Sequence, residues 1–347
     1  MSNVNILIIG NGFDLAHGLK TKYVDFLKFC KNFTDTNVIS NLNIDKQQWD
    51  NLIKLLKNNL WIEHFYTCDT LKEGWIDFEL EISRVIKKIN DDYNKLNGNY
   101  GYMEVSTLNE LDDIIDPRLK KSEKYDLVKL RKKLENDLKN LIDALELYML
   151  YIVEKADINI YSPDVKEIKI DKILSFNYTH TYMKQYNDNV ECNFIHGETD
   201  QNSNDNNMVL GIDDYTPENL ISKDIEFIRF KKYFQRIHKK TGSEYKKWIN
   251  KMAANNYSGN GFYHIGKKRN EVFIFGHSLD VTDKDILSEI ILSDTVKTTI
   301  FYLDEEVYAQ QIANLVKIIG KDKLIEKVSA IEPTIIFKKQ QDMVPIN

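Results

Sequence analysis

The sequence predicts an α/β protein with a Rossmann-like parallel sheet that is interrupted by a large helical insertion. Three observations predict this class. Short runs that are apolar at every position, typical of strands buried on both faces, occur at the start and in the second half of the chain. In the second half, segments with apolar residues at three- and four-residue steps alternate with these runs. Between them, from about residue 33 to residue 157, helical spacing predominates.

Length and composition limit the class of protein. The 347 residues suffice for one large domain or two ordinary ones, and the net charge of -6 is no global signature of a nucleic-acid-binding protein. Cys30, Cys68 and Cys192 form no CxxC pair, so we expect a reducing compartment and no cysteine-based zinc site. The sequence shows neither a signal peptide nor a run of about 20 apolar residues. We therefore expect a cytoplasmic protein that does not enter a membrane.

The first predicted element is a strand in NILIIG, which begins at Asn5 and runs into the glycine-rich turn GNGFD and a helix. Helical spacing then dominates WDNLIKLLKNNLWIEHFY, DFELEISRVIKKINDDY and KYDLVKLRKKLENDLKNLIDALELYMLYIVEKA. The segment KLNGNYGYMEVSTLNELDDIIDP interrupts this spacing and is predicted to be a loop or an arm. We expect the helical insertion to cover a cleft of the sheet.

Strand patterns return at Lys169. In order they are KIDKILSFNYT, VECNFIHGE, VLGIDDY, EVFIFGHSL, VKTTIFYLD and PTIIFKK. Helices are predicted at about residues 217–254, in DKDILSEIIL and in YAQQIANLVKIIG. The predicted core therefore comprises residues 1–32 and 166–347, with the helical segment 217–254 within it, and residues 33–165 form the insertion.

Four predicted strands end in unusual polar tips, which are GNGFD, SFNYTH, FIHGE and FGHSLD. Ligands of open α/β sheets bind outside the carboxyl ends of the strands, so we expect these four tips to converge on one cleft. Each tip alone has a simpler explanation. Glycines follow strands because turns require φ > 0, Asn177 can cap a turn, Ser278 can begin a helix, and a single histidine is often a hydrogen-bonded core residue.

The motifs GNGFDLAHGL, WIDFE, LSFNYT, IHGE and FGHSLDVTDKDIL resemble the AbiH family of bacterial phage abortive-infection proteins. The order of the tips is also similar, more distantly, to the sirtuin-like NAD-binding fold. There, a glycine-rich first turn, an Asn-containing tip, a His-Gly pair and a late Gly-x-Ser follow one another. The chain departs from sirtuins at Asn11 and Phe13-Asp14, in the absence of the four zinc cysteines of protein deacylases, and at Thr179, which replaces an acid. The resemblance implies antiphage defence with NAD as a substrate.

The tips and the resemblance together give the candidate site. Asn177 and His196 are the predicted catalytic residues, because an amide can orient a ribose or a water and a neutral imidazole can accept a proton. Glycines before a helix let backbone N–H groups approach a pyrophosphate. Asp14 either contacts a ribose or caps the helix, and Asp283 is expected to bind ribose hydroxyls. The predicted cofactor-binding residues are Gly10, Asn11, Gly12, Phe13, Asp14, Thr179, Gly197, Gly276, His277, Ser278 and Asp283.

The leading hypothesis is NAD glycohydrolysis that depletes NAD on infection, and two alternatives stay open. The first is a nuclease that uses RFKKYFQRIHKKTGSEYKKWINK, residues 229–251, because basic residues with interleaved aromatics suit nucleic acid. An amphipathic helix pair with its aromatics in the core explains the same segment more simply. The second alternative is a non-catalytic nucleotide-binding sensor.

A metal site is considered in WIDFELEI, where Asp77, Glu79 and Glu81 could hold a nuclease metal. No matching Asp/Glu/Lys cluster occurs at the strand tips, so we predict no metal, and Trp75 and Phe78 are expected to anchor the helical block on the sheet. The predicted partners are a nucleotide substrate and a phage-derived trigger. Nucleic acid at residues 229–251 and a homo-oligomer are left open, and no membrane partner is expected.

Overall fold

The computed structural model describes residues 4–32, 46–72, 76–98, 127–200, 205–212, 227–257 and 269–346. By its internal contacts the chain divides into two compact units. Unit 1 comprises Met1–Lys20, Ala156–Thr199 and Lys240–Asn347, and unit 2 comprises Thr21–Lys155 and Asp200–Lys239. Neither unit is continuous in sequence, because the chain enters and leaves unit 2 twice. Trp75, residues 217–226 and most of the predicted loop at 95–117 lie outside the described residues.

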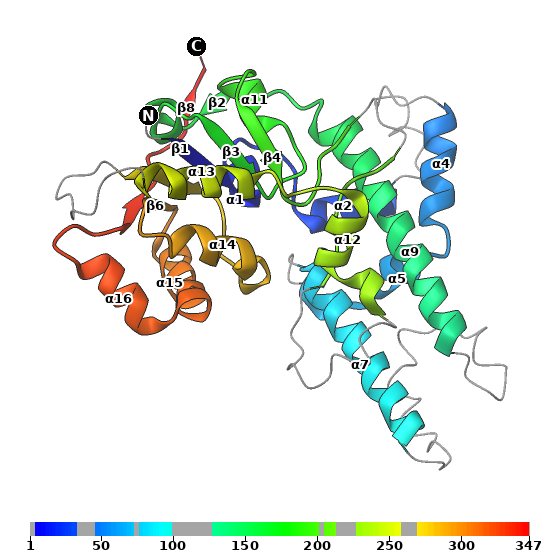
Figure 1. The fold of residues 1–347 in the computed structure, drawn as a ribbon. Coiled ribbons are helices and arrows are strands. Elements are labelled where there is room, and N and C mark those ends of the chain that lie inside the picture. Colours follow the sequence, from blue (N-terminus) through cyan, green and yellow to red (C-terminus); the bar gives the residue numbers. More distant parts are fainter. Residues whose placement is uncertain are drawn as a thin grey trace. The chain divides into compact units, whose positions relative to one another are not determined.

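Unit 1 is built on a six-stranded parallel sheet with the strand order β4-β3-β1-β5-β6-β7 (Figure 1). The strands are β1 Asn5–Ile9, β3 Lys172–Ser175, β4 Glu191–Phe194, β5 Asn270–Phe275, β6 Val296–Tyr302 and β7 Ile335–Lys339. Counted in chain order within this sheet, the arrangement is 3-2-1-4-5-6, the order of Rossmann folds. The predicted Rossmann-like α/β class is therefore confirmed. The sheet order does not distinguish a sirtuin-like variant, which stays a prediction.

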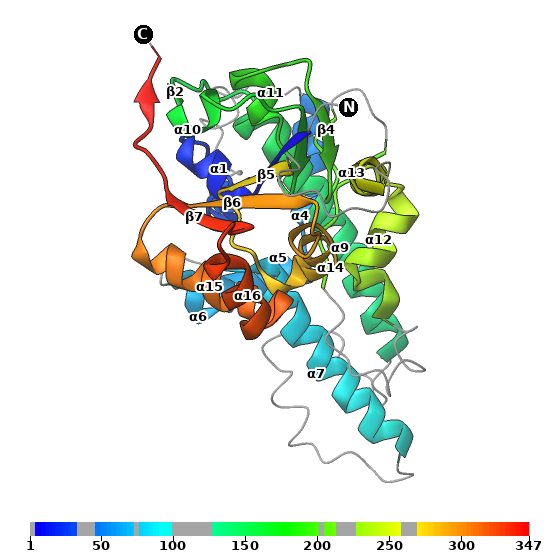
Figure 2. The ribbon, with the colours of Figure 1, turned by 60° about the vertical axis from the view of Figure 1, so that its left-hand side comes forward.

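The central strand β1 explains why both faces of the sheet are covered. Successive side chains of a strand point to opposite faces, so Ile6 and Ile8 join one hydrophobic core and Leu7 and Ile9 join another. The first core is completed by helices α13 Tyr245–Tyr257, α14 Lys284–Ile291, α15 Glu305–Ile319 and α16 Lys321–Ser329. The second is completed by α1 Asn11–Ala16, α10 Pro163–Lys166 and α11 Thr181–Gln185 (Figure 2).

A second, two-stranded sheet lies in unit 1. In it, β2 Ile160–Tyr161 pairs antiparallel with β8 Val344–Pro345. These strands are too short to leave a periodic pattern, and the sequence did not predict them. One predicted strand is wrong: residues 209–212 of VLGIDDY form no strand and make one isolated bridge, from Ile212 to Lys231. The other predicted strands are present.

Within its described residues, unit 2 contains helices and no strand. They are α2 Tyr23–Asn32, α4 Lys46–Leu56, α5 Leu60–Thr67, α6 Asp69–Lys72, α7 Phe78–Gly98, α9 Leu127–Tyr148, the π-helical turn Met149–Val153 and α12 Lys232–Lys239. Phe78 is fully buried, and its ring stacks on Phe65 and Tyr23 of the same unit, at 4.1 Å between ring centroids in each case. None of the described helices has the length and apolar character needed to span a bilayer.

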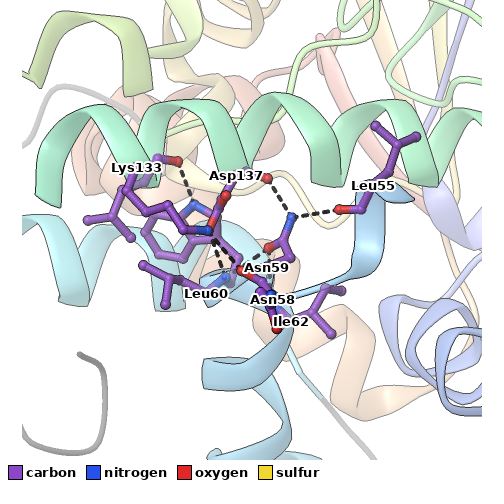
Figure 3. A network of polar contacts seen from close by, with 9 residues as sticks. Leu55, Asn58, Asn59, Leu60, Ile62, Lys133 and Asp137 are labelled. Carbon is purple, nitrogen blue, oxygen red and sulfur yellow. Dashed lines mark hydrogen bonds and ion pairs between the residues drawn. The ribbon is translucent and has the colours of Figure 1, made fainter. Parts of the chain in front are cut away.

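A buried polar network fixes the start of α5 on α9 (Figure 3). Asn59 caps α5, because its Oδ1 accepts hydrogen bonds from the backbone N of Trp61 and Ile62 at 3.1 and 3.3 Å. The amide of Asn59 donates to the carbonyl of Asp137 at 2.8 Å, and Asp137 Oδ2 accepts from Leu60 N at 2.8 Å. Lys133 pairs with Asp137 and donates to the carbonyl of Asn58 at 2.8 Å. Hydrogen bonds within the protein therefore hold α5 in its orientation on α9.

Candidate functional site

The turns after the neighbouring strands β1 and β5 touch each other at the carboxyl edge of the sheet. Gly12 N donates to Gly276 O at 2.8 Å, and a Cβ at Gly12 would lie 2.8 Å from both the Cα and the O of Gly276. Gly276 has φ +66, which a side chain would strain. The close packing of these two turns is therefore enough to explain both glycines, whether or not a ligand binds there. The pyrophosphate interpretation of Gly12 stays a prediction.

Asn177 links the end of β3 to the turn after β1. Its Nδ2 donates to the carbonyl of Gly10 at 2.9 Å, and its side chain is buried. Ser175, the last residue of β3, donates from Oγ to Asn177 O at 3.1 Å and accepts from Asn177 N at 3.2 Å. The predicted catalytic amide therefore holds two strand ends together.

Asp14 makes a second link between the same two strand ends. It lies in the first turn of α1 and is 1% exposed. Thr179 Oγ1 donates to its Oδ2 at 2.6 Å, and Thr181 Oγ1 donates to Thr179 Oγ1 at 3.1 Å. The hydrogen bond of Asp14 to Thr179 differs from a helix cap: the N-cap residue of α1 is Gly10, which has no side chain.

Two histidines from different strand ends approach one carboxylate, and we call His196, His277 and Asp283 the histidine group. His196 Nε2 lies 3.4 Å from Asp283 Oδ1, and His277 Nε2 lies 3.5 Å from Asp283 Oδ2. All three side chains are buried. Phe176 packs edge-on against both imidazoles, with ring centroids 5.5 Å from His196 and 4.3 Å from His277. The end of β4, the end of β5 and the start of α14 thus meet at this carboxylate.

A hydrogen bond sets the tautomer of His277. Leu279 N donates to His277 Nδ1 at 2.9 Å, so Nδ1 is the acceptor and the neutral ring carries its proton on Nε2, which faces Asp283. The backbone of Leu279 has φ +57, an unusual conformation for a bulky residue. Such strain persists only where the surroundings fix it, and it concentrates at functional sites.

Helix α15 supplies the groups that hold this loop. Gln311 Nε2 donates to the carbonyls of His277 and Phe301, each at 3.2 Å, and Asn314 Nδ2 donates to the carbonyl of Ser278 at 2.9 Å. Both amides are buried. Neither Gln311 nor Asn314 is among the predicted site residues. The sequence does contain a pattern that could have identified them: two amides lie three residues apart on the apolar side of a predicted helix.

The other predicted site residues are Asn11, Phe13, Gly197 and Ser278. The side chain of Phe13 is fully buried in the core under α1, where it packs edge-on against Phe275 at 5.8 Å between centroids. Asn11 and Ser278 are exposed, and Gly197 follows His196 with φ +78. Asp280 Oδ1 accepts from Thr282 N at 3.0 Å, so Asp280 caps the short helix Val281–Asp283, as a helix-start acid should.

The histidine of the first motif, His17, has a structural role. His17 Nδ1 lies 2.7 Å from the carbonyl of Phe13, which can only accept, so Nδ1 carries the proton and Nε2 accepts from the Tyr186 hydroxyl at 2.7 Å. That hydroxyl in turn accepts from Ser162 N at 2.7 Å. Burial lowers the pKa of His17, which favours the neutral ring that this hydrogen-bond chain needs.

The basic segment at 229–251 is divided between the two units. In unit 1, Tyr245 and Trp248 of α13 are buried in the core, while Lys246 and Lys247 of the same helix are exposed. In unit 2, Lys232 is buried and pairs with Glu79 at 2.7 Å between Nζ and Oε2. Helix α13 therefore has the core-facing aromatics of the simpler explanation, whereas α12 buries Lys232 and Gln235 and leaves Tyr233 exposed. Binding of nucleic acid at this segment stays a prediction.

The model of the family described as bacteriophage abortive infection AbiH matches residues 6–303, which run from within β1 to just past the end of β6 and include every predicted site residue. Comparison with curated proteins finds no match.

Proposed function

Because the chain belongs to the AbiH family and so has a role in abortive-infection defence against phage, we propose that it carries out this role by hydrolysing NAD to nicotinamide and ADP-ribose. The histidine group is the observation that carries this proposal. It lies at the carboxyl edge of a sheet with Rossmann strand order, where dinucleotides bind.

The reaction needs a group that accepts one proton. The C1′–N bond of the nicotinamide riboside breaks, nicotinamide leaves as a neutral base with the bonding electrons, and a water oxygen bonds to C1′. The water proton passes to the imidazole of His196, and Asp283 stabilises the imidazolium that results. Asn177 orients the ribose or the water. His277, whose Nε2–H faces Asp283, holds that carboxylate in position.

The two alternatives receive less support. Of the three acids considered for a nuclease metal, Asp77, Glu79 and Glu81, one is already engaged, because Glu79 pairs with Lys232. A non-catalytic sensor needs the nucleotide site but does not need a base. A variant without His196 therefore distinguishes the two hypotheses, because a sensor would keep its function and an enzyme would lose it.

The test is to incubate purified full-length protein with NAD and to quantify nicotinamide and ADP-ribose by chromatography. We expect release of both products, and a loss of about 100-fold or more in the His196→Ala protein. His238→Ala on α12 is the control, because that histidine is exposed in unit 2. The same variants, expressed in cells challenged with phage, should show NAD loss only where His196 is intact.

Two results would overturn the proposal. One is turnover in His196→Ala equal to that of the unaltered protein. The other is a cellular NAD level that stays constant during a defence response that still occurs. Retained nucleotide binding and retained defence in His196→Ala would favour the sensor.

A further inference from the structure

Unit 2 holds a mixed cluster of three donor side chains that the proposed function does not use. His64 lies on α5, Cys68 directly follows α5, and Glu81 lies in the first turn of α7. His64 Nε2 is 3.8 Å from Cys68 Sγ, Glu81 Oε2 is 3.6 Å from Cys68 Sγ, and His64 Nε2 is 3.6 Å from Glu81 Oε2. Among the residues that the structure describes, these three side chains form a group of possible metal ligands whose donor atoms all lie within 4.8 Å of one another.

The triangle formed by these atoms has the size that a tetrahedral ion requires. Zinc binds sulfur at about 2.3 Å and imidazole nitrogen or carboxylate oxygen at about 2.0–2.2 Å, so two tetrahedral ligand atoms lie about 3.4–3.6 Å apart. The observed edges of 3.6, 3.6 and 3.8 Å exceed this by at most a few tenths of an ångström.

We propose that His64, Cys68 and Glu81 bind one zinc ion that joins α5 to α7. Thiolate, imidazole and carboxylate are the three ligand types that zinc accepts, and hard cations such as Mg²⁺ and Ca²⁺ avoid thiolate. Thiolate and carboxylate together balance the two positive charges of the ion. Three protein ligands leave the fourth position to a water or a small ligand.

The surroundings of the cluster fit this assignment. Arg84 pairs with the other carboxylate oxygen, Oε1 of Glu81, and so leaves Oε2 directed at His64 and Cys68.

The scaffold of the cluster is rigid on the α5 side. Asn59 and Asp137 fix the start of α5 on α9, and Trp61 Nε1 donates to the carbonyl of Leu134 at 2.9 Å. His64 and Cys68 are four residues apart, so they lie on one side of the helix end. This inference goes beyond the proposed function and does not depend on it, since the cluster and the histidine group belong to different units.

The test uses the full chain, purified without a polyhistidine tag and stripped with a chelator. Zn²⁺ is titrated by calorimetry, and Co²⁺ is used as a spectroscopic probe, because a cobalt–thiolate bond gives a charge-transfer absorption. We expect one ion per chain, and at least about 100-fold weaker binding in Cys68→Ser and Glu81→Gln. Cys192→Ser and Glu63→Gln are the matched controls. Cys192 lies in unit 1, and Glu63 is an exposed acid next to His64.

Each outcome decides the question. A cobalt–thiolate absorption that is lost in Cys68→Ser and kept in Cys192→Ser supports the site, as does a zinc-dependent rise in Tm that needs Glu81. Far-ultraviolet circular dichroism verifies that the variants are folded. Binding of less than one ion by the folded protein, or equal binding by Cys68→Ser, overturns the proposal and leaves the cluster as a hydrogen-bonded triad. NAD turnover that survives the chelator would leave the proposed function standing in either case.

Discussion

Single residues at the strand ends have two kinds of role that a sequence does not separate. Gly12 and Gly276 have no side chain because the turns after β1 and β5 pack so closely that a Cβ at either position would collide with the other turn. Asn177 donates a hydrogen bond to the carbonyl of Gly10 in the turn after β1. His196, His277 and Asp283, by contrast, form contacts that a proton transfer can use. Residue type and strand position predicted both sets. The partners could not be predicted, because each contact joins positions that only the folded sheet brings together.

Gly12→Ala tests the packing role at this scale. The added Cβ would lie 2.8 Å from the backbone of Gly276, which cannot move without disturbing β5. We expect the free energy of unfolding to fall by about 1–3 kcal/mol. Gly18→Ala is the comparison: its Cβ meets nothing within 4 Å, so only its φ of +81 opposes the change and a loss of about 1 kcal/mol is expected.

Chemical denaturation of both variants measures these values. If Gly12→Ala keeps its full stability and loses only nucleotide binding, the glycine serves the ligand and the packing explanation fails.

Whole elements were predicted where a long periodic pattern exists. The apolar strands of the sheet and the amphipathic helices α14 and α15 follow directly from their spacing. The strand predicted in VLGIDDY failed for a physical reason. Gln235 satisfies the backbone of Leu210 with two hydrogen bonds, at 3.1 and 2.9 Å, and Ile212 N donates to the carbonyl of Phe230 at 2.7 Å. The amide of Gln235 thus takes the hydrogen-bonding place of a neighbouring strand. The local sequence around Leu210 cannot indicate this, because Gln235 lies 25 residues away.

The attachment of α5 to α9 gives a prediction at the scale of elements. Asn59→Ala removes a helix cap and a buried hydrogen bond to the carbonyl of Asp137, so we expect a loss of about 2–3 kcal/mol in the free energy of unfolding. Asn58→Gly is the matched control. The backbone of Asn58 has φ +55, which glycine adopts readily, and its carbonyl remains available to Lys133.

Urea unfolding followed by circular dichroism compares these two variants. Equal stabilities of Asn59→Ala and Asn58→Gly would show that the network does not fix α5. The metal geometry proposed for His64 and Cys68 would then lose its rigid support.

At the scale of the molecule, a buried carboxylate ties the middle of the chain to its end. Asp164 Oδ1 lies 2.7 Å from Lys338 Nζ, and its Oδ2 accepts from Gln341 N at 2.7 Å. Burial alone would raise the pKa of Asp164, but the hydrogen bonds from Gln341 and Lys338 outweigh it and hold the pKa below its usual value. The ionised form is therefore favoured by folding.

This shift predicts a pH-dependent stability. The contribution of Asp164 is complete above its unfolded-state pKa of about 3.9 and is lost as the pH falls through the lower folded-state pKa. At pH 7 we expect Asp164→Asn to be about 1–3 kcal/mol less stable than the unaltered protein, with the difference shrinking below about pH 4. Asp342→Asn, an exposed neighbour, should change little. Denaturation across pH checks this, and a constant difference at every pH would contradict it.

Because β1 lies in the middle of the sheet, it has to wait during synthesis for both of the strands that pair with it. β1 is synthesised before β3 and β5, with which it pairs, and 266 positions separate Val4, just before β1, from its hydrogen-bond partner Asn270 at the start of β5. At about 5–20 residues per second, that interval is roughly 13–50 s of synthesis. The histidine group is complete only when Asp283 has been added. A nascent chain that stops short of Asp283 therefore lacks the carboxylate that both histidines approach.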